Sequence, residues 1–149
     1  MTLSASRAWL DAMDQRISFV TLAVADLDRT RAFYVDGLGW RPEVFVPGEV
    51  LMIKAGDKLV LSLWSEDGFE AEVGPIRRGE GVVPITLAHN VATEAEVDEI
   101  LELAVSLGAE SSPGERRDWG GYTGYFADPD GFRWEIAMNP DEVGRLVLP

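Results

Sequence analysis

The 149-residue sequence has no cysteine and one histidine. The absence of cysteine excludes disulfides, thiolate nucleophiles and every zinc or iron–sulfur site that depends on cysteine ligands. Long apolar runs are absent too, and no segment approaches the ~18 consecutive apolar residues of a membrane-spanning helix. Residues 1–16 mix apolar with charged side chains, unlike a secretory signal. We therefore expect a cytoplasmic protein that begins with a short amphipathic helical arm at 1–16.

Basic residues are scarce. The sequence holds 13 lysines and arginines against 26 aspartates and glutamates, which gives a formal net charge of −13 at pH 7. A field of this sign repels nucleic acid and anionic membranes and attracts cations. We expect neither nucleic acid nor a membrane as a partner, and a cationic small molecule is favoured. An acidic surface that only keeps the protein soluble explains the same composition, so both interpretations stay open.

The sequence contains an internal repeat. Thr21-Leu22-Ala23 recurs as Thr86-Leu87-Ala88, and each copy lies in an apolar run that a helical pattern follows. This predicts an α+β fold of two βαβββ repeats, which form a curved mixed sheet around a cleft with the helices outside. We expect a single domain at 17–140, with repeat one at 17–64, a connector at 65–81, repeat two at 82–140 and a C-terminal tail at 141–149.

Periodicity and turn residues place the elements within each repeat. Thr93 and Glu96 form a capping box for a helix that Gly108 ends. Pro129 and Gly131 predict a type I hairpin turn at 128–131 with a structural role. The connector is rich in glycine, proline and charge, which predicts a surface excursion with a short helical turn or the role of a lid. The predicted strands are 17–24, 43–46, 50–55, 59–64, 83–91, 109–111, 122–127 and 132–138, and the predicted helices are 28–35 and 94–107.

Alternating side chains divide each strand into a face that packs on the helices and a face that lines the cleft. On this basis His89 lies on the helix face, where a capping or buried hydrogen-bonding role is favoured over that of a base or ligand. Glu135 points into the cleft. A structural ion pair with Arg133 and a binding or catalytic role for Glu135 are equally supported. The side chains assigned to the helix face are Val20, Leu22, Val24, Leu59, Leu61, Leu63, Ile85, Leu87, His89, Val91, Trp134, Ile136 and Met138.

Aromatic residues gather near the predicted cleft and beside glycines. As a group they predict a wall for a planar or cationic ligand, although for any single ring a place in the core or in a dimer interface is favoured. The predicted ligand-binding residues are Phe19, Thr21, Ser62, Trp64, Thr86, Trp119, Tyr122, Tyr125, Arg133 and Glu135.

Three strings of residues carry a family resemblance. They are FVTLAVADL at 19–27, RAFY at 31–34 with GLGW at 37–40, and YFADPDGFRWE at 125–135. In this order they closely resemble the vicinal oxygen chelate superfamily, which includes glyoxalase I, bleomycin resistance proteins and extradiol dioxygenases. The resemblance covers 17–140. It implies paired βαβββ units around a cleft, commonly completed by a homodimer, and it is specific for the fold rather than for the reaction.

Metal-dependent members of that superfamily take ligands from the first and last strands of each unit, at positions that map here to Phe19, Ser62, Pro84 and Glu135. Only Glu135 is a strong ligand, because phenylalanine and proline offer no side-chain donor and serine is a poor one. The resemblance therefore implies a protein that has lost most of its metal site. No cofactor is expected, and a divalent metal at this site, or at a remodelled one with His89 or nearby carboxylates, is disfavoured.

Three functions follow from this. The first is a metal-free small-molecule-binding protein of the glyoxalase/bleomycin resistance type, with a hydrophobic or cationic ligand in an acidic, aromatic cleft. The second is an enzyme, either a lyase or dioxygenase with a remodelled metal site, or a lyase or isomerase with Glu135 as general base and a tyrosine as acid. The third is a dimerising interaction module without a ligand. Neither the ligand nor the presence of catalysis is decided by the sequence.

Overall fold

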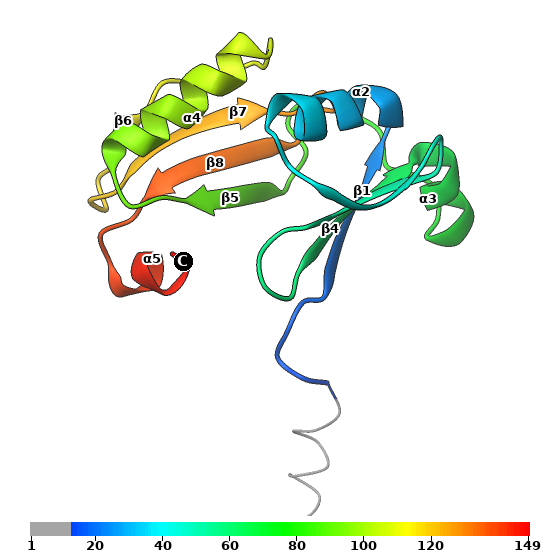
Figure 1. The fold of residues 1–149 in the computed structure, drawn as a ribbon, viewed down its shortest axis with the longest axis horizontal. Coiled ribbons are helices and arrows are strands. Elements are labelled where there is room, and N and C mark those ends of the chain that lie inside the picture. The colour runs from blue at the N-terminus through cyan, green and yellow to red at the C-terminus, as the bar shows by residue number, and fades with distance from the viewer. Residues whose placement is uncertain (1–12) are drawn as a thin grey trace, which may run out of the picture.

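The computed structural model describes residues 13–149, so most of the expected helical arm at 1–16 lies outside the described residues. Two units of the same design follow one another along the chain (Figure 1). The first unit consists of β1 (Phe19–Val24), α2 (Leu27–Arg31), the π-helical turn η1 (Ala32–Gly37), β2 (Pro42–Val46), β3 (Val50–Lys54) and β4 (Val60–Ser65). The second consists of β5 (Thr86–Asn90), α4 (Glu94–Ser106), β6 (Glu115–Arg116), β7 (Tyr122–Ala127) and β8 (Arg133–Met138).

Each unit forms a four-stranded mixed sheet, and the strand order is the same in both. The orders are β1-β4-β3-β2 and β5-β8-β7-β6, with the first pair parallel and the others antiparallel. Helices α2 and α4 lie on the same side of the two sheets (Figure 1). The predicted α+β fold of two βαβββ repeats is therefore confirmed.

Two further helices lie outside the repeated pattern. In the connector, α3 (Glu66–Glu72) begins at Ser65, whose Oγ accepts a hydrogen bond from the Gly68 backbone at 3.1 Å. This is the short helix that the connector sequence predicts. After β8, α5 (Glu142–Leu146) forms a single short turn of helix. Within residues 13–149, none of the helices has the length and apolar character needed to cross a bilayer.

Local chemistry explains where the repeat helices begin and end. The Thr93 hydroxyl accepts a hydrogen bond from the Glu96 backbone at 3.2 Å, as the predicted N-cap requires. Asp26 caps α2 in the same way. The backbone of η1 closes with a Leu38 N–H to Phe33 carbonyl bond of 2.9 Å, five residues apart, which is a π-type turn. At Gly37 a Cβ would lie only 2.8 Å from Leu107 Cδ1, so glycine allows the two units to approach closely.

Two predicted elements differ from the structure. The segment at 109–111 is not a strand, although Ser111 forms an isolated bridge with Phe126, and the short strand β6 comes four residues later. The strand predicted from residue 83 begins only at Thr86. Pro84 lacks a backbone N–H, and proline is tolerated only at the edge or the start of a strand.

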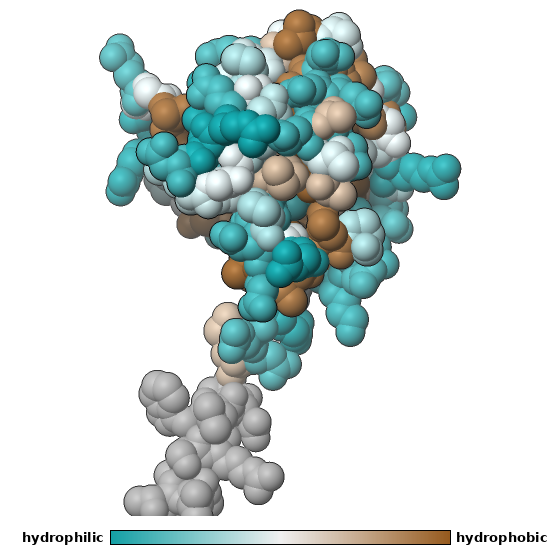
Figure 2. All heavy atoms as spheres, turned by 90° about the vertical axis from the view of Figure 1, so that its left-hand side faces the viewer, coloured by the Kyte–Doolittle hydropathy of each residue, from teal (hydrophilic) through white to brown (hydrophobic). Residues whose placement is uncertain are grey.

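The helix-facing side chains make a continuous core. Leu22, Val24, Leu61, Leu63, Trp134 and Ile136 are all at most 6% exposed, as their alternation predicts. An aromatic cluster joins the two units: Phe33 and Tyr34 of the first unit face Phe126 and Trp134 of the second, with ring centroids 6.0 and 6.3 Å apart. The side of the molecule seen in Figure 2 is mainly hydrophilic, with scattered apolar side chains.

A buried chain of hydrogen bonds also crosses between the units. Trp134 Nε1 donates to the Tyr34 hydroxyl at 3.0 Å, and that hydroxyl donates to Asp128 Oδ2 at 2.6 Å. The other Asp128 oxygen accepts from the backbones of Asp130 and Phe132. Burial raises the pKa of the Tyr34 hydroxyl and that of the Asp128 carboxyl above their ordinary values.

The predicted turn at 128–131 is confirmed by the 3.0 Å bond from the Gly131 N–H to the Asp128 carbonyl. Its second aspartate, Asp130, also reaches the first unit. Asp130 Oδ1 accepts from the Ala25 backbone at 2.8 Å, and Arg29 and the Thr30 hydroxyl approach its two oxygens at 3.4 Å. The hairpin turn is therefore a joint between the two repeats as well as a reversal of the chain.

Candidate functional site

The most polar part of the cleft-facing surface lies on the sheet of the second unit. By register, Ala88 of β5, Glu135 of β8 and Tyr125 of β7 are neighbours on one face. The Tyr125 hydroxyl donates a hydrogen bond to Glu135 Oε2 at 2.6 Å. This bond to an acceptor carboxylate raises the pKa of the Tyr125 hydroxyl above its usual value. Both side chains are half-buried, so a ligand can reach them.

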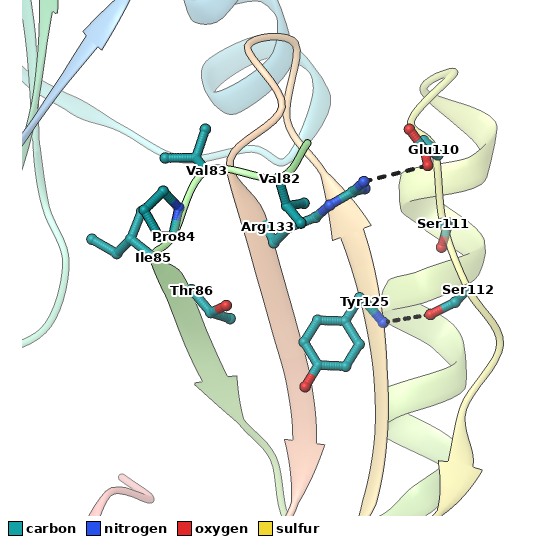
Figure 3. Close-up of a pocket in the computed structure, with 10 residues that line it drawn as sticks. All are labelled: Val82, Val83, Pro84, Ile85, Thr86, Glu110, Ser111, Ser112, Tyr125 and Arg133. Carbon is teal, nitrogen blue, oxygen red and sulfur yellow. Dashed lines mark hydrogen bonds and ion pairs between the residues drawn. The ribbon is translucent and has the colours of Figure 1, made fainter. Parts of the chain in front are cut away.

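A pocket of about 510 Å³ opens beside Tyr125 (Figure 3). This volume lies within the ~300–1,000 Å³ range that is usual for small-molecule sites. One wall is apolar and comes from the end of the connector and the start of β5, whereas the opposite wall is polar and comes from β7, β8 and the segment at 110–112. We call this the ligand pocket. Its ten lining residues are Val82, Val83, Pro84, Ile85, Thr86, Glu110, Ser111, Ser112, Tyr125 and Arg133.

Arg133 does not pair with Glu135, so the structural ion pair, one of the two alternatives left open by the sequence, is absent. Its Nη2 lies 3.4 Å from Glu110 Oε1, and Figure 3 shows the guanidinium extended across the pocket toward that residue. Glu135 is engaged by the Tyr125 hydroxyl on the neighbouring strand. Glu135 thus accepts from a neutral donor and has no ion pair with Arg133, while the charge of a different arginine, Arg117, acts on the Tyr125 hydroxyl.

The equivalent face of the first unit is covered by its own side chains. Ser62 is 1% exposed, and its Oγ accepts a hydrogen bond from Trp64 Nε1 at 2.8 Å. The Trp64 ring in turn meets Phe69 of α3 edge-on, with centroids 6.3 Å apart. Thr21 lines a second hollow of about 590 Å³, between β1, the connector and the turn after β7. Phe19 is 54% exposed at the start of β1.

Three other sequence predictions are corrected by the structure. Tyr122 lies on the helix face, where its hydroxyl donates to Asp98 of α4 at 2.7 Å, because it pairs in register with Met138. Trp119 lies in the loop before β7 with its ring against Gly121, apart from the ten lining residues.

His89 is exposed rather than buried. It shares the helix face of Ile136, but β5 is an edge strand that α4 does not cover.

Sequence reasoning missed most of the pocket lining, on both walls. Val82, Val83, Glu110 and Ser112 were not among the predicted ligand-binding residues, although all four line it. The predicted strand at 109–111 already indicated part of this lining, because a segment that runs beside β7 must also lie beside Tyr125 of that strand. The structure keeps that adjacency: Ser112 Oγ accepts from the Tyr125 backbone at 3.1 Å.

The geometry agrees with comparisons to known proteins. The family model described as the glyoxalase/bleomycin resistance protein/dioxygenase superfamily matches residues 16–136. The chain belongs to this superfamily. A glyoxalase-related enzyme from Fulvimarina pelagi is 35% identical, with a TM-score of 0.76 over 85% of this chain and 90% of that one. Lactoylglutathione lyase from Agrobacterium tumefaciens is 26% identical, with a TM-score of 0.66 over 85% and 95%.

More distant members share the fold alone. A glyoxalase/bleomycin resistance protein/dioxygenase from Nocardioides is 20% identical, with a TM-score of 0.74 over 95% of this chain and 96% of that one. No curated protein sequence matches the chain. Membership of the superfamily confirms the resemblance seen in the sequence, while the chemistry must be argued from the site.

The superfamily's metal site does not fit the residues present here. At the four positions expected to hold the metal, Phe19 and Pro84 have no donor atom and the Ser62 oxygen is occupied by Trp64. The remaining position, Glu135, is bonded to Tyr125. Across residues 13–149, no three histidine, aspartate or glutamate side chains are grouped so as to hold an ion. One carboxylate is too few for a catalytic divalent metal, which generally has about three protein ligands.

We expect divalent metals to leave the protein's melting temperature unchanged. An ion present at 100 times its Kd would stabilise the fold by about 2.7 kcal/mol and raise the melting temperature by several degrees. Thermal melts with Mn²⁺, Fe²⁺, Ni²⁺ and Zn²⁺, together with metal analysis of the dialysed protein, make this measurement. Stoichiometric metal with a raised melting temperature would contradict the expectation.

Proposed function

We propose that the chain is a small-molecule-binding protein of this superfamily, which holds a hydrophobic or cationic compound in the ligand pocket without a metal. The observation that best supports this is an apolar wall that faces Tyr125, whose hydroxyl binds a carboxylate that Arg133 does not pair with. Pro84 and Ile85 lie opposite Tyr125, and Tyr125 holds Glu135 at 2.6 Å. Such a pocket desolvates an apolar body, and Glu135, which lies outside the ten lining residues, offers a carboxylate next to it.

Electrostatics favour a cation at Glu135. The chain carries a net charge of −13, so the field at its surface attracts positive ligands. The Tyr125 ring adds a π face to the same pocket, and a cation near such a face gains roughly 0.5–2 kcal/mol. Because Arg133 points away toward Glu110, the Glu135 carboxylate is available to a ligand ammonium.

We also propose a homodimer. Phe19 and Ile85 are 54% and 39% exposed, and Val44 on the edge strand β2 is 42% exposed. Large apolar side chains of this kind gather at subunit interfaces when they form a contiguous surface. A second copy laid over Phe19 and Ile85 would bury both side chains and would close the open ligand pocket, which Ile85 lines. Val44 lies at the opposite edge of the first sheet. Dimerisation thus supports ligand binding and does not replace it.

A second candidate function is proton-transfer catalysis by the same pair. Glu135 is placed to remove a proton from a carbon next to a carbonyl group, and the Tyr125 hydroxyl, whose one proton is donated to Glu135 in the structure, turns to donate it to the carbonyl oxygen that gains charge. The 2.6 Å contact places the base and the donor side by side. Such a step would make the protein a lyase or an isomerase, and one structural neighbour is named as a lactoylglutathione lyase.

Ligand binding is tested with benzylamine, a small aromatic cation, and benzyl alcohol, its neutral counterpart. By isothermal titration calorimetry, we expect benzylamine to bind more tightly than benzyl alcohol. Glu135→Gln should lower the affinity for benzylamine about tenfold, because one charge-assisted contact is lost, and should leave the affinity for benzyl alcohol unchanged. Glu99→Gln on the exposed surface of α4 makes the same charge change outside the pocket and should change neither affinity.

Two results would contradict the proposal. Failure of both probes to bind at millimolar concentration would remove the ligand-binding function. Equal loss in the Glu135 and Glu99 variants would show that only net charge matters. Isomerase or lyase activity that is lost in both Glu135→Gln and Tyr125→Phe would instead select the second candidate.

A further inference from the structure

We infer that the natural ligand of the pocket is amphoteric: it carries a carboxylate that binds Arg133 in addition to the cationic or hydrogen-bond-donating end that reaches Glu135. This inference rests on the proposed binding function and adds the class of ligand to it. It begins from the charge inside the pocket. Arg133 is the single basic side chain among the ten lining residues of a chain with 26 acidic groups.

The ion pair that Arg133 makes within the protein is weak. Its side chain is 29% exposed, and its contact with Glu110 is 3.4 Å long, whereas charge-assisted N–H···O bonds are usually about 2.7–2.9 Å. The Glu110 side chain is 78% exposed, and ion pairs at such exposed sites contribute little. A guanidinium has five N–H donors in a planar fork that matches a carboxylate, so Arg133 retains donors for a ligand.

The two charged anchors lie in line on one strand. Arg133 and Glu135 are two residues apart on the same face of β8, which separates their backbones by about 6.6 Å. Tyr125 is the register neighbour of Glu135 on β7, and the apolar wall that includes Ile85 faces Tyr125 across the pocket (Figure 3). Glu135 itself lies outside the ten lining residues and is joined to the pocket by its hydrogen bond to Tyr125. A matching ligand therefore has a flat apolar body of about one ring, with a carboxylate at one end and an ammonium or other donor at the other.

Glu110 is the competitor in this arrangement. It lies at the rim of the pocket, and in the absence of ligand it occupies part of the Arg133 fork. A ligand carboxylate must displace it. Removing the Glu110 charge should therefore improve binding of the ligand's anionic end, and removing the Arg133 charge should abolish the benefit of that end.

The experiment compares 4-(aminomethyl)benzoate with benzylamine, which lacks only the carboxylate, and the readout is the ratio of their affinities. In the wild-type protein we expect 4-(aminomethyl)benzoate to bind about tenfold more tightly, the effect of one bidentate charged contact. Arg133→Gln should bring the ratio close to one, and Arg133→Lys should give an intermediate value because lysine keeps the charge but not the fork. Glu110→Gln should raise the ratio about threefold, and this gain should shrink in high salt.

Matched controls separate a local contact from net charge. Arg116→Gln alters an exposed arginine that pairs with Glu94 at 3.1 Å away from the pocket, and Glu99→Gln alters an exposed glutamate on α4. Both should leave the ratio unchanged. Because the ratio is taken within one variant, general damage to the pocket cancels, and thermal melts of each variant verify folding.

The outcomes distinguish this inference from the function on which it rests. If neither probe binds the wild-type protein, the proposed function fails. If benzylamine binds but the carboxylate adds no affinity, or if Arg133→Gln keeps the wild-type ratio, the amphoteric ligand is ruled out and simple cation binding remains. A lower ratio in Glu110→Gln would also overturn it, since that result would make Glu110 a support for Arg133 and not its competitor.

Discussion

Replacing Tyr34 with phenylalanine is expected to lower the free energy of unfolding by about 3 kcal/mol, which corresponds to a drop of roughly 10 °C in melting temperature. The change removes one hydroxyl and no other atom. That hydroxyl is the acceptor for Trp134 Nε1 and the donor to Asp128, and Asp128 is 4% exposed. The variant therefore leaves a buried indole N–H without its acceptor and a buried carboxylate with one donor fewer. Urea unfolding measured by circular dichroism gives the value.

The pH dependence of this loss identifies its cause. Burial raises the pKa of Asp128 in the folded state, so the contribution of this group to stability is complete below the carboxyl pKa of the unfolded chain and is lost as pH rises through the folded value. The Tyr34 hydrogen bond opposes the shift because it favours the charged carboxylate. Tyr34→Phe should therefore destabilise the protein more at pH 7 than at a pH near 4, where a protonated Asp128 needs fewer donors.

Tyr122→Phe is the matched control. It removes the same atom from a tyrosine that also donates to an aspartate, Asp98, but at the surface of α4. We expect a much smaller loss of stability, because water replaces the missing partner. An equal loss in the two variants, or a Tyr34→Phe effect that does not change with pH, would show that the buried carboxylate is not the reason.

Replacing Asp130 with alanine should cost about 2 kcal/mol, the second of the two large effects. The side chain is 7% exposed, and its oxygens serve the backbone of Ala25 and the side chains of Arg29 and Thr30 in the first unit. The loss should appear as a lower urea midpoint with an unchanged m-value, because we expect two units joined by buried hydrogen bonds and an aromatic cluster to unfold together.

Asp57→Ala provides the comparison for Asp130→Ala. Asp57 lies in an exposed bend between β3 and β4, so the same chemical change there should have almost no effect. If Asp130→Ala were as mild as Asp57→Ala, the turn at 128–131 would be a hairpin reversal only. A broadened transition with a lower m-value would instead show that the units separate before they unfold.

The sequence predicted the fold well because the fold depends on local patterns. Alternation in β1 and β8 identifies Leu22, Val24, Trp134 and Ile136 as core residues, and the repeated Thr-Leu-Ala string predicts two units of one design. The same alternation placed His89 on the correct face but did not predict that its side chain is exposed. It tells which face of a strand a residue occupies, but not whether the strand lies at the edge of its sheet, beyond the reach of the covering helix.

The candidate site was harder to predict because its contacts join distant segments. An ion pair of Arg133 with Glu135 was one of two equally supported alternatives, yet Arg133 approaches Glu110, 23 residues away, and Glu135 bonds to the adjacent strand. The role of Asp128 and Asp130 in joining the units was missed for the same reason: the turn motif explained their presence locally. The ligand class and the lack of a metal stay predictions that the experiments above test, and the homodimer stays a proposal.

The hydrogen bonds of Tyr34 also determine when the first unit can finish folding during translation. Its two partners come 94 and 100 residues later in the chain. While the ribosome is still making the second unit, Phe33 and Tyr34 have neither Phe126 nor Trp134 to cover them. The nascent first unit therefore keeps an aromatic surface open to water and to chaperones until nearly the entire described chain has emerged. The two repeats are alike in design, but in a growing polypeptide the earlier one depends on the later.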